Sequence, residues 1–362
     1  MWPNSELTDL LNVDLPIIQS PMAGASGAEM AVAVSNAGGL GSLPCAMFQQ
    51  SEVRAAIAAV RNLTSKPVST NFFCHASPAP DPGRDRIWRE RLARYYEELH
   101  IEISDSARST SRAPFDAAMC EVVEETKPEV VSFHFGLPES SLIGRVKACG
   151  AVIISSATTV EEARWLEDHG CDAIIAQGCE AGGHRAMFLA KDIAAQVGTF
   201  ALVPQVLDAV SVPVIAAGGI SDGRGIAAAF ALGASGVQIG TAYLLTKESL
   251  ITDVHRRALR RARDDMTALT NVFSGRPARG IINRVVRELG PMSEIVPNFP
   301  AAGAALAPLK AKAEMNASGD FSALWAGQGA ALAHETSAAE LTQGLADDAQ
   351  RRLSALAPPV PA

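Results

Sequence analysis

The sequence lacks any extended basic segment, although it contains 31 lysines and arginines. Its 39 acidic residues outnumber them and give a formal net charge of −8. The most basic stretch, 256–263, is followed directly by Asp264 and Asp265. A net negative chain without a basic patch disfavours nucleic acids and anionic membranes as partners.

Long apolar runs and paired cysteines are missing as well. No stretch approaches the roughly 20 apolar residues that are needed to span a bilayer. Glu6 and Asp9 stand where a secretory signal would carry basic and apolar residues. The six cysteines show no C-x-x-C motif and no metal-type spacing, which favours free thiols in a reducing compartment. We therefore expect a cytoplasmic protein without a metal site.

Aromatic residues make up only 5% of the chain, yet 48% of it is hydrophobic, which is enough for a large core. Short runs rich in β-branched residues alternate with helical patterns, the signature of parallel β/α units. The strands are expected at 16–22, 40–44, 67–73, 130–136, 151–157, 173–178, 212–217 and 236–243. The intervening helices are expected at 28–37, from 51, at 115–126, up to 149, and at 159–170, 200–210 and 223–232.

The number of strands favours an α/β fold of the (β/α)₈ TIM-barrel type. An open doubly wound sheet would more often have about five or six strands. The first strand is also not followed by the G-x-G-x-x-G motif of an open dinucleotide-binding sheet.

Two parts of the chain depart from the alternation. Prolines and glycine at 78–83 predict an insertion after the third strand, over about 74–114, with an exposed amphipathic helix at 84–100. Beyond about Thr246 no strand pattern is visible, and 265–289 and 310–333 look helical or loop-like. We expect these last two segments to cap one end of the barrel.

The expected division of the chain follows from these patterns. Residues 1–250 should form the barrel, and 251–354 a mostly helical C-terminal extension or lid. Residues 355–362 contain three prolines and are expected to be a flexible tail.

Glycines recur where the seventh and eighth strands end, and active sites of such barrels lie at the C-terminal ends of the strands. Gly218 and Gly219 follow the seventh strand, and Gly240 and Thr241 follow the eighth. Glycine lets backbone N–H groups approach an anion closely, and a helix N-terminus adds positive partial charge. One such pair could simply make a tight turn, but the two together favour a phosphate site.

Amide and imidazole side chains also fall at the expected barrel mouth. Asn71 and Gln177 each offer a donor and an acceptor, which suits the edge of a flavin ring, although capping a loop is the simpler role. His184 follows Gly182 and Gly183 in a loop expected to arch over the mouth, and histidine exchanges protons near neutral pH. His134, within the fourth strand, is the second candidate.

Several segments together resemble the nitronate monooxygenases, formerly called 2-nitropropane dioxygenases, and are most similar to their class I. These segments are PIIQSPMAG, SNAGGLGSL, NFFCH, VSFHFGLP, AQGCEAGGHR, VIAAGGI, LGASGVQIGTAYL and LWAGQ, and they extend over 16–328. The resemblance implies FMN as the cofactor and His184 as the catalytic base. With the strand-end analysis, the expected FMN-binding residues are Met22, Ala23, Gly24, Asn71, Gln177, Gly182, Gly183, Gly218, Gly219, Gln238, Gly240 and Thr241. His134 and Phe299 are the expected substrate contacts.

The implied reaction is the oxidation of alkyl nitronates, and of nitroalkanes, by O₂ to a carbonyl compound and nitrite through a flavin semiquinone. The partners would be a small-molecule substrate and O₂, and a homodimer is compatible with the sequence. Class I members tend to carry tyrosines and a lysine before WAGQ, whereas 299–307 holds no tyrosine and the nearest lysine is Lys310. The substrate therefore stays open.

Two alternatives to this reaction also stay open. An NAD(P)H-dependent reductase of quinones or enoyl thioesters could use the same barrel. A non-catalytic flavin-binding protein is the other alternative.

Overall fold

A closed ring of parallel strands forms the centre of the computed structural model, which describes residues 2–102 and 113–356. Neighbours in the sheet follow the order β1-β9-β8-β6-β5-β4-β3-β2, and a parallel bridge between Ile18 and Leu40 joins its two ends. The strands are β1 (Ile17–Gln19), β2 (Gly41–Pro44), β3 (Val68–Phe73), β4 (Val130–His134), β5 (Val152–Ala157), β6 (Ala173–Gln177), β8 (Val214–Ala217) and β9 (Gly236–Ile239). The expected (β/α)₈ barrel is confirmed.

Helices cover the outside of this barrel where the alternation predicts them. They are α2 (Ala28–Asn36), α3 (Gln50–Arg61), α5 (Ala117–Thr126), α6 (Ser140–Ala148), α7 (Val160–Asp168), α8 (Thr199–Leu207) and α9 (Gly223–Ala231). Side-chain caps begin two of them: Thr159 accepts a hydrogen bond from the Glu162 N–H, and Asp222 accepts from Arg224 and Gly225. A further short helix, α1 (Glu6–Leu11), packs Leu7 and Leu11 against the inward-facing strand residues.

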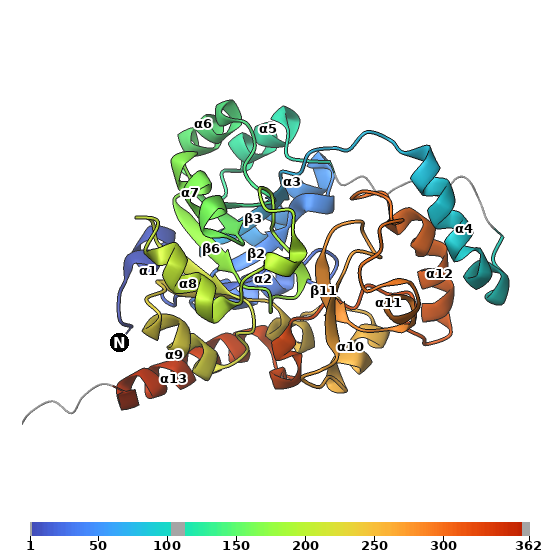
Figure 1. Cartoon of the computed structure of the whole chain (residues 1–362). Helices are drawn as coiled ribbons and strands as arrows, with labels where there is room; N and C mark the ends of the chain where they lie inside the picture. The colour runs from blue at the N-terminus through green and yellow to red at the C-terminus, as the bar shows by residue number, and fades with distance from the viewer. Residues whose placement is uncertain (1, 103–112, 357–362) are drawn as a thin grey trace, which may run out of the picture.

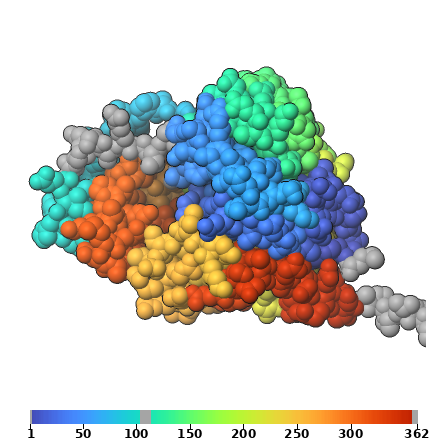
Figure 2. Space-filling view, turned by 180° about the vertical axis from the view of Figure 1, so that it is seen from behind, coloured from blue at the N-terminus to red at the C-terminus, as the bar shows by residue number. Residues whose placement is uncertain are grey.

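The eighth outer position is occupied by α13 (Ala338–Leu356), which we expected to belong to a C-terminal extension. This helix packs between α9 and α2, and the Tyr243 hydroxyl lies 2.8 Å from the Thr342 hydroxyl. In the reverse view of Figure 2, the red α13 residues lie along the lower edge beneath the blue N-terminal part of the chain. The barrel therefore does not end near residue 250. The expected division was wrong here, because a helix almost 100 residues after its strand carries no local sign of belonging to it.

The residues between β9 and α13 build most of a second lobe beside the barrel. It comprises α10 (Asp253–Arg260), β10 (Thr267–Thr270), β11 (Ala278–Ile281), α11 (Arg284–Leu289) and α12 (Gly303–Met315). Helix α4 (Pro82–Glu98) joins it from the insertion after β3. Figure 1 shows these elements together on the right, with the barrel on the left. We refer to them as the lobe.

Two expectations for the lobe are corrected by the structure. Helix α4 is not simply exposed, because Trp88, Leu92, Tyr95 and Tyr96 are buried in an apolar cluster with residues of α11 and α12. The segment 265–289, expected to be helical or loop-like, contains β10 and β11, which pair with each other and with β7 (Gly183–His184) in an antiparallel sheet. Strands of two to four residues are too short to show an alternating pattern.

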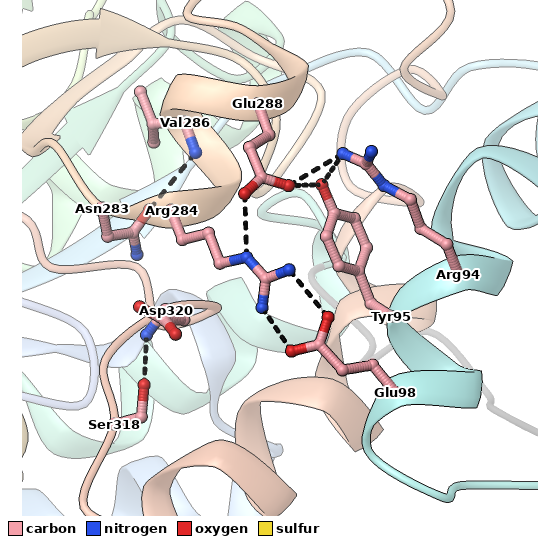
Figure 3. A network of polar contacts seen from close by, with 9 residues as sticks. All are labelled: Arg94, Tyr95, Glu98, Asn283, Arg284, Val286, Glu288, Ser318 and Asp320. Carbon is pink, nitrogen blue, oxygen red and sulfur yellow. Dashed lines mark hydrogen bonds and ion pairs between the residues drawn. The ribbon is translucent and has the colours of Figure 1, made fainter.

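A polar network fastens α4 to α11 at the surface of the lobe (Figure 3). Arg284 donates to both carboxylate oxygens of Glu98, at 2.6 and 2.7 Å, and to Glu288 at 2.9 Å. Glu288 also accepts from the Tyr95 hydroxyl at 2.8 Å and from Arg94 at 2.8 Å. Such partly exposed pairs contribute little singly, but the shared carboxylate and the bidentate geometry fix the orientation of the two helices.

Some expectations from the sequence fall on residues that the structure does not describe. Those on membrane-spanning helices and on the cysteines can be compared with it directly. Residues 103–112 of the expected insertion and residues 357–362 of the expected tail lie outside the described residues. Within the described ranges no helix is both long and apolar enough to cross a membrane. All six cysteines lie in those ranges as unpaired thiols, and burial raises the pKa of Cys45 and Cys171 to about 12.

The packing of α13 on α9 predicts opposite effects for two glycine substitutions. In Gly223→Ala the new methyl would meet backbone atoms of Asp348 and Ala349 at 2.6–2.7 Å. We expect the free energy of unfolding to fall by about 1–3 kcal/mol. In Gly144→Ala, at an exposed position of α6, the methyl meets no atom within 4 Å, and helix propensity should raise the free energy of unfolding by about 0.5–1 kcal/mol. Urea unfolding measures both, and equal values would contradict the assignment of α13 to the barrel wall.

Candidate active site

The glycine loops after β8 and β9 lie open at the C-terminal end of the barrel. Gly218 and Gly219 have φ values of +117° and +71°, a backbone region that favours glycine. A Cβ at Gly218 would lie 2.7 Å from the Thr199 hydroxyl oxygen, so no side chain fits there. Gly219 is exposed, and Gly240 and Thr241 are partly exposed. The backbone of both loops is therefore accessible to a ligand.

The late WAGQ segment lies directly against these loops. The Gly327 N–H donates to the Thr241 hydroxyl at 2.9 Å, and the Gln328 N–H donates to the Glu180 carbonyl at 2.9 Å. A Cβ at Gly182 would meet the Gly327 nitrogen at 2.5 Å, so the two backbones are in direct contact. Segments far apart in the sequence thus meet around one position at the barrel mouth.

The helix dipole expected to assist at Gly218 and Gly219 is already engaged. Helix α9 begins at Gly223, and its first N–H groups, from Arg224 and Gly225, donate to the Asp222 carboxylate at 2.9 and 3.3 Å. A negative side chain at this position offsets the positive end of the helix. An anion at this position would therefore be bound by the accessible backbone of the two loops and not by the helix dipole.

His184 lies on β7, which is paired with the lobe. The register places Gly183 opposite Arg279 and His184 opposite Ala278. The Nε2 atom of His184 lies 2.9 Å from the Ser274 hydroxyl oxygen, which fixes the plane of the ring. The expected loop over the mouth is therefore a strand, and the lobe determines where the candidate base lies.

Four aromatic rings surround the imidazole of His184, and we call them the aromatic cage. The ring centroids lie 6.4 Å from Phe73, 5.9 Å from Phe135, 5.5 Å from Phe299 and 5.5 Å from Trp325. Phe299, the expected substrate contact, is thus placed beside the candidate base. His75, which the sequence did not single out, also joins the group, with its ring 4.8 Å from that of Phe299.

His134 comes to the same place but with an unsuitable pKa for a base. Its ring centroid lies 4.5 Å from Phe135 and 5.9 Å from Phe73. Burial, assisted by the positive charge of Arg276, lowers the pKa of His134 to about 3. It is therefore neutral near pH 7 and a very weak proton acceptor, which leaves His184 as the stronger candidate.

The two predicted amides hydrogen-bond with protein groups. Asn71 donates to the Ser132 hydroxyl at 2.8 Å. The Gln177 side-chain oxygen accepts from Arg185 and from the Ala186 N–H, both at 2.9 Å, and its nitrogen donates to the His184 carbonyl at 3.1 Å. Gln177 thus holds the backbone at His184 and at Ala186.

The remaining predicted residues lie on adjacent strands of the same arc. The Met22 sulfur is 3.7 Å from the position that a Cβ at Gly240 would take, so the ends of β1 and β9 meet. Gly24 and Gly183 both have positive φ, and a Cβ at either would meet no atom within 4 Å. Ala23 lies in the same turn as Gly24, and Gln238, on β9, is partly exposed. Open space is therefore present beside the predicted flavin contacts.

Sequence reasoning missed the buried residues that hold the backbone next to His184. Arg185 is fully buried and donates to the Gln177 carbonyl at 2.7 Å, and burial lowers the pKa of Arg185 to about 10. The buried Glu162 carboxylate accepts from the N–H groups of Phe188, Leu189 and Ala190, at 2.7–3.2 Å. Ser274, Arg185 and Glu162 lie on different segments, and no motif links them in the sequence.

Known proteins resemble this chain over nearly its whole length. The family model for nitronate monooxygenase matches residues 4–348. A nitronate monooxygenase from Pseudomonas aeruginosa is 43% identical over 343 residues, which cover 94% of this chain and 98% of that protein.

Solved structures agree with this match. A nitroalkane oxidase from Streptomyces ansochromogenes has a TM-score of 0.89 and 39% identity, covering 98% of this chain and all of the other. FabK from Thermotoga maritima has a TM-score of 0.71 and 28% identity, covering 97% of both chains. The family match includes the barrel, the lobe and most of α13, and this chain therefore belongs to the nitronate monooxygenase family of oxidoreductase enzymes.

Proposed function

We propose that this enzyme binds FMN at the barrel mouth and oxidises alkyl nitronates, and nitroalkanes after removal of a proton, with O₂. The observation that carries the proposal is the placement of His184. Its ring lies inside the aromatic cage, with a 2.9 Å contact from Nε2 to Ser274, on a segment that touches the glycine loops. The names of the P. aeruginosa and S. ansochromogenes relatives support the same chemistry.

The residues at the mouth fit FMN. Gly218, Gly219, Gly240 and Thr241 would hold the phosphate through their accessible backbone, and three of the four carry no side chain. The open space beside Gly24 and Gly183 would admit the ring system. When bound, FMN supplies an electron acceptor, which protein side chains cannot provide.

His184 has two tasks in this proposal. It removes the α-proton of a neutral nitroalkane, for which a positioned imidazole is suited near neutral pH. The aromatic cage excludes water from the nitronate, so nearby charges act on it more strongly than they would in solution. One such charge is Arg276, whose guanidinium carbon lies 3.9 Å from the centre of the Phe135 ring and which favours an anionic substrate.

The overall reaction balances without a further oxidant. The carbon–nitrogen bond of the nitronate breaks, a carbon–oxygen double bond forms, and nitrite leaves with its electron pair. Two nitronate ions and one O₂ give two carbonyl compounds and two nitrite ions, with equal atoms and charge on both sides.

The phosphate position is tested by Gly219→Asp. A carboxylate at this position would repel the phosphate of FMN in a site of low polarity, so the purified variant should be colourless where the wild type is yellow. Gly144→Asp is the matched control, because Gly144 is at an exposed position of α6 where a Cβ meets no atom within 4 Å, and it should keep its flavin. Bound flavin is measured by absorbance and, after denaturation, identified as FMN by chromatography. Retention of FMN by Gly219→Asp at wild-type level would overturn this phosphate site.

The role of His184 is tested by His184→Asn on two substrates. Turnover of neutral nitroalkanes should fall by about 10²–10⁴-fold, the usual contribution of a positioned acid–base group. Preformed nitronate already lacks the proton, so the variant should keep much more of its activity on that substrate. Both values of kcat/KM are measured by oxygen consumption, with FMN content as the check that the site is intact.

Other outcomes would redirect the assignment. Equal losses on both substrates would mean that His184 binds the anion and does not transfer a proton. A wild-type enzyme that ignores nitronates, but whose flavin is bleached by NADH or NADPH under anaerobic conditions, would favour the reductase alternative instead.

A further inference from the structure

Arg185 is a fully buried cation whose side-chain hydrogen bonds all go to neutral oxygen atoms. Its guanidinium donates to the side-chain oxygen of Gln196 at 2.9 and 3.0 Å and to that of Gln177 at 2.9 Å. It also donates to the Gln177 carbonyl at 2.7 Å and to the Gly178 carbonyl. These bonds satisfy the donors of the guanidinium, but none of them supplies a negative charge.

Arg279, on β11, is a second buried guanidinium of the same kind. It donates to the Cys179 carbonyl at 2.9 Å and to the Thr267 hydroxyl at 3.2 Å. Within 2–102 and 113–356, neither Arg279 nor Arg185 forms an ion pair. The two arginines thus bond to the carbonyls of Gly178 and Cys179, the consecutive residues that follow β6.

Two carboxylates act on Arg185 through space, but both are bonded to other groups. Glu162 accepts from three backbone N–H groups at 2.7–3.2 Å, and Glu180 accepts from the N–H and the hydroxyl of Thr199 at 2.9–3.0 Å. Burial lowers the pKa of Arg185 to about 10, and the carboxylates of Glu180 and Glu162 are among the groups that oppose this shift. Arg185 is therefore charged near pH 7, with no negative group in direct contact.

We propose that Arg185 and Arg279 raise the reduction potential of the flavin bound at the barrel mouth. The inference rests on the proposed function, because it assumes that FMN binds at the strand ends where Gln177 and the glycine loops lie. Reduction by two electrons and one proton turns the neutral oxidised ring of a flavin into an anion, and the reductant in the experiment below is dithionite. Charge close to the ring is a general means by which proteins tune this equilibrium.

The physical reason is the low polarity around the two guanidinium groups. A charge in such surroundings acts on its neighbours more strongly than the same charge in water. A buried cation therefore favours the negative form of a nearby group, as it does for an acid whose pKa it lowers. A higher potential would make FMN a stronger electron acceptor for the nitronate. A purely structural role of the two arginines would instead leave the potential independent of their charge.

Two substitutions place a carboxylate against each guanidinium while keeping an oxygen atom as the acceptor. They are Gln196→Glu beside Arg185 and Thr267→Asp beside Arg279. Unit charges about 10 Å apart, at an effective dielectric constant of about 20, change an equilibrium by about tenfold. We therefore expect either variant to lower the ratio of reduced to oxidised FMN, at a fixed applied potential, by about tenfold. This corresponds to a fall in midpoint potential of about 30 mV for two electrons.

The midpoint potential of bound FMN is measured from its absorbance during an anaerobic dithionite titration with a reference dye. Gln205→Glu is the matched control, because it adds the same charge at an exposed position of α8, where the Gln205 amide donates to the Ala201 carbonyl. Gln196→Ala removes the acceptor of Arg185 without adding charge. Both of these variants should keep the wild-type potential, because only a change in charge is expected to move it.

The results distinguish this inference from the function on which it rests. An unchanged potential in FMN-loaded Gln196→Glu and Thr267→Asp would overturn the inference and leave nitronate oxidation standing. A shift of the same size in Gln205→Glu or Gln196→Ala would also overturn it, because the potential would then not depend on the charge beside the two arginines. A wild-type chain that binds no FMN would instead remove the proposed function, and the inference with it.

Discussion

The candidate site depends on the pairing of two residues, Gly183 and His184, with strand β11. This short ladder is the sheet contact between the loop after β6 and the lobe. Phe73 and Phe135 of the aromatic cage come from the barrel, whereas Phe299 and Trp325 come from the chain between β9 and α13. The cage therefore exists only while the lobe is docked, and β7 sets the position at which its two halves meet.

Hydrogen bonds from buried side chains to the backbone around β7 make that position rigid. Gln177 and Arg185 hold the backbone around His184, and Glu162 holds the three residues that follow Met187. These groups are buried and bonded to backbone N–H or C=O groups, where satisfied polar contacts specify one arrangement. A histidine held in this way enters the reaction with its orientation already fixed, which lowers the entropy cost of catalysis.

The barrel could be predicted from the sequence because its signals are local. Most strands are buried runs rich in apolar residues with a helix soon after them, and Gly218 and Gly219 mark a turn through the residues themselves. The glycine loops and His184 could be placed at the mouth for the same reason, once the strands were assigned.

The other half of the site could not be predicted in this way. The partner of His184, Ser274, is 90 positions distant, and β10 and β11 are four residues each. Pairings between such distant and short segments are determined by tertiary packing, which overrides local propensity. The burial of Trp88 and Tyr95 on α4 followed the same rule, since the pattern showed one apolar face but not the helices that cover it.

The position of α13 has a consequence for the order in which the molecule assembles. Roughly 100 residues separate β9 from α13, and at about 5–20 residues per second their synthesis takes about 5–20 s. During that interval the ring of strands is complete while the groove between α2 and α9 still lacks Leu341 and Leu345, which later fill it. We therefore expect this groove to be the surface of the nascent chain most exposed to aggregation, and the one where a chaperone would act.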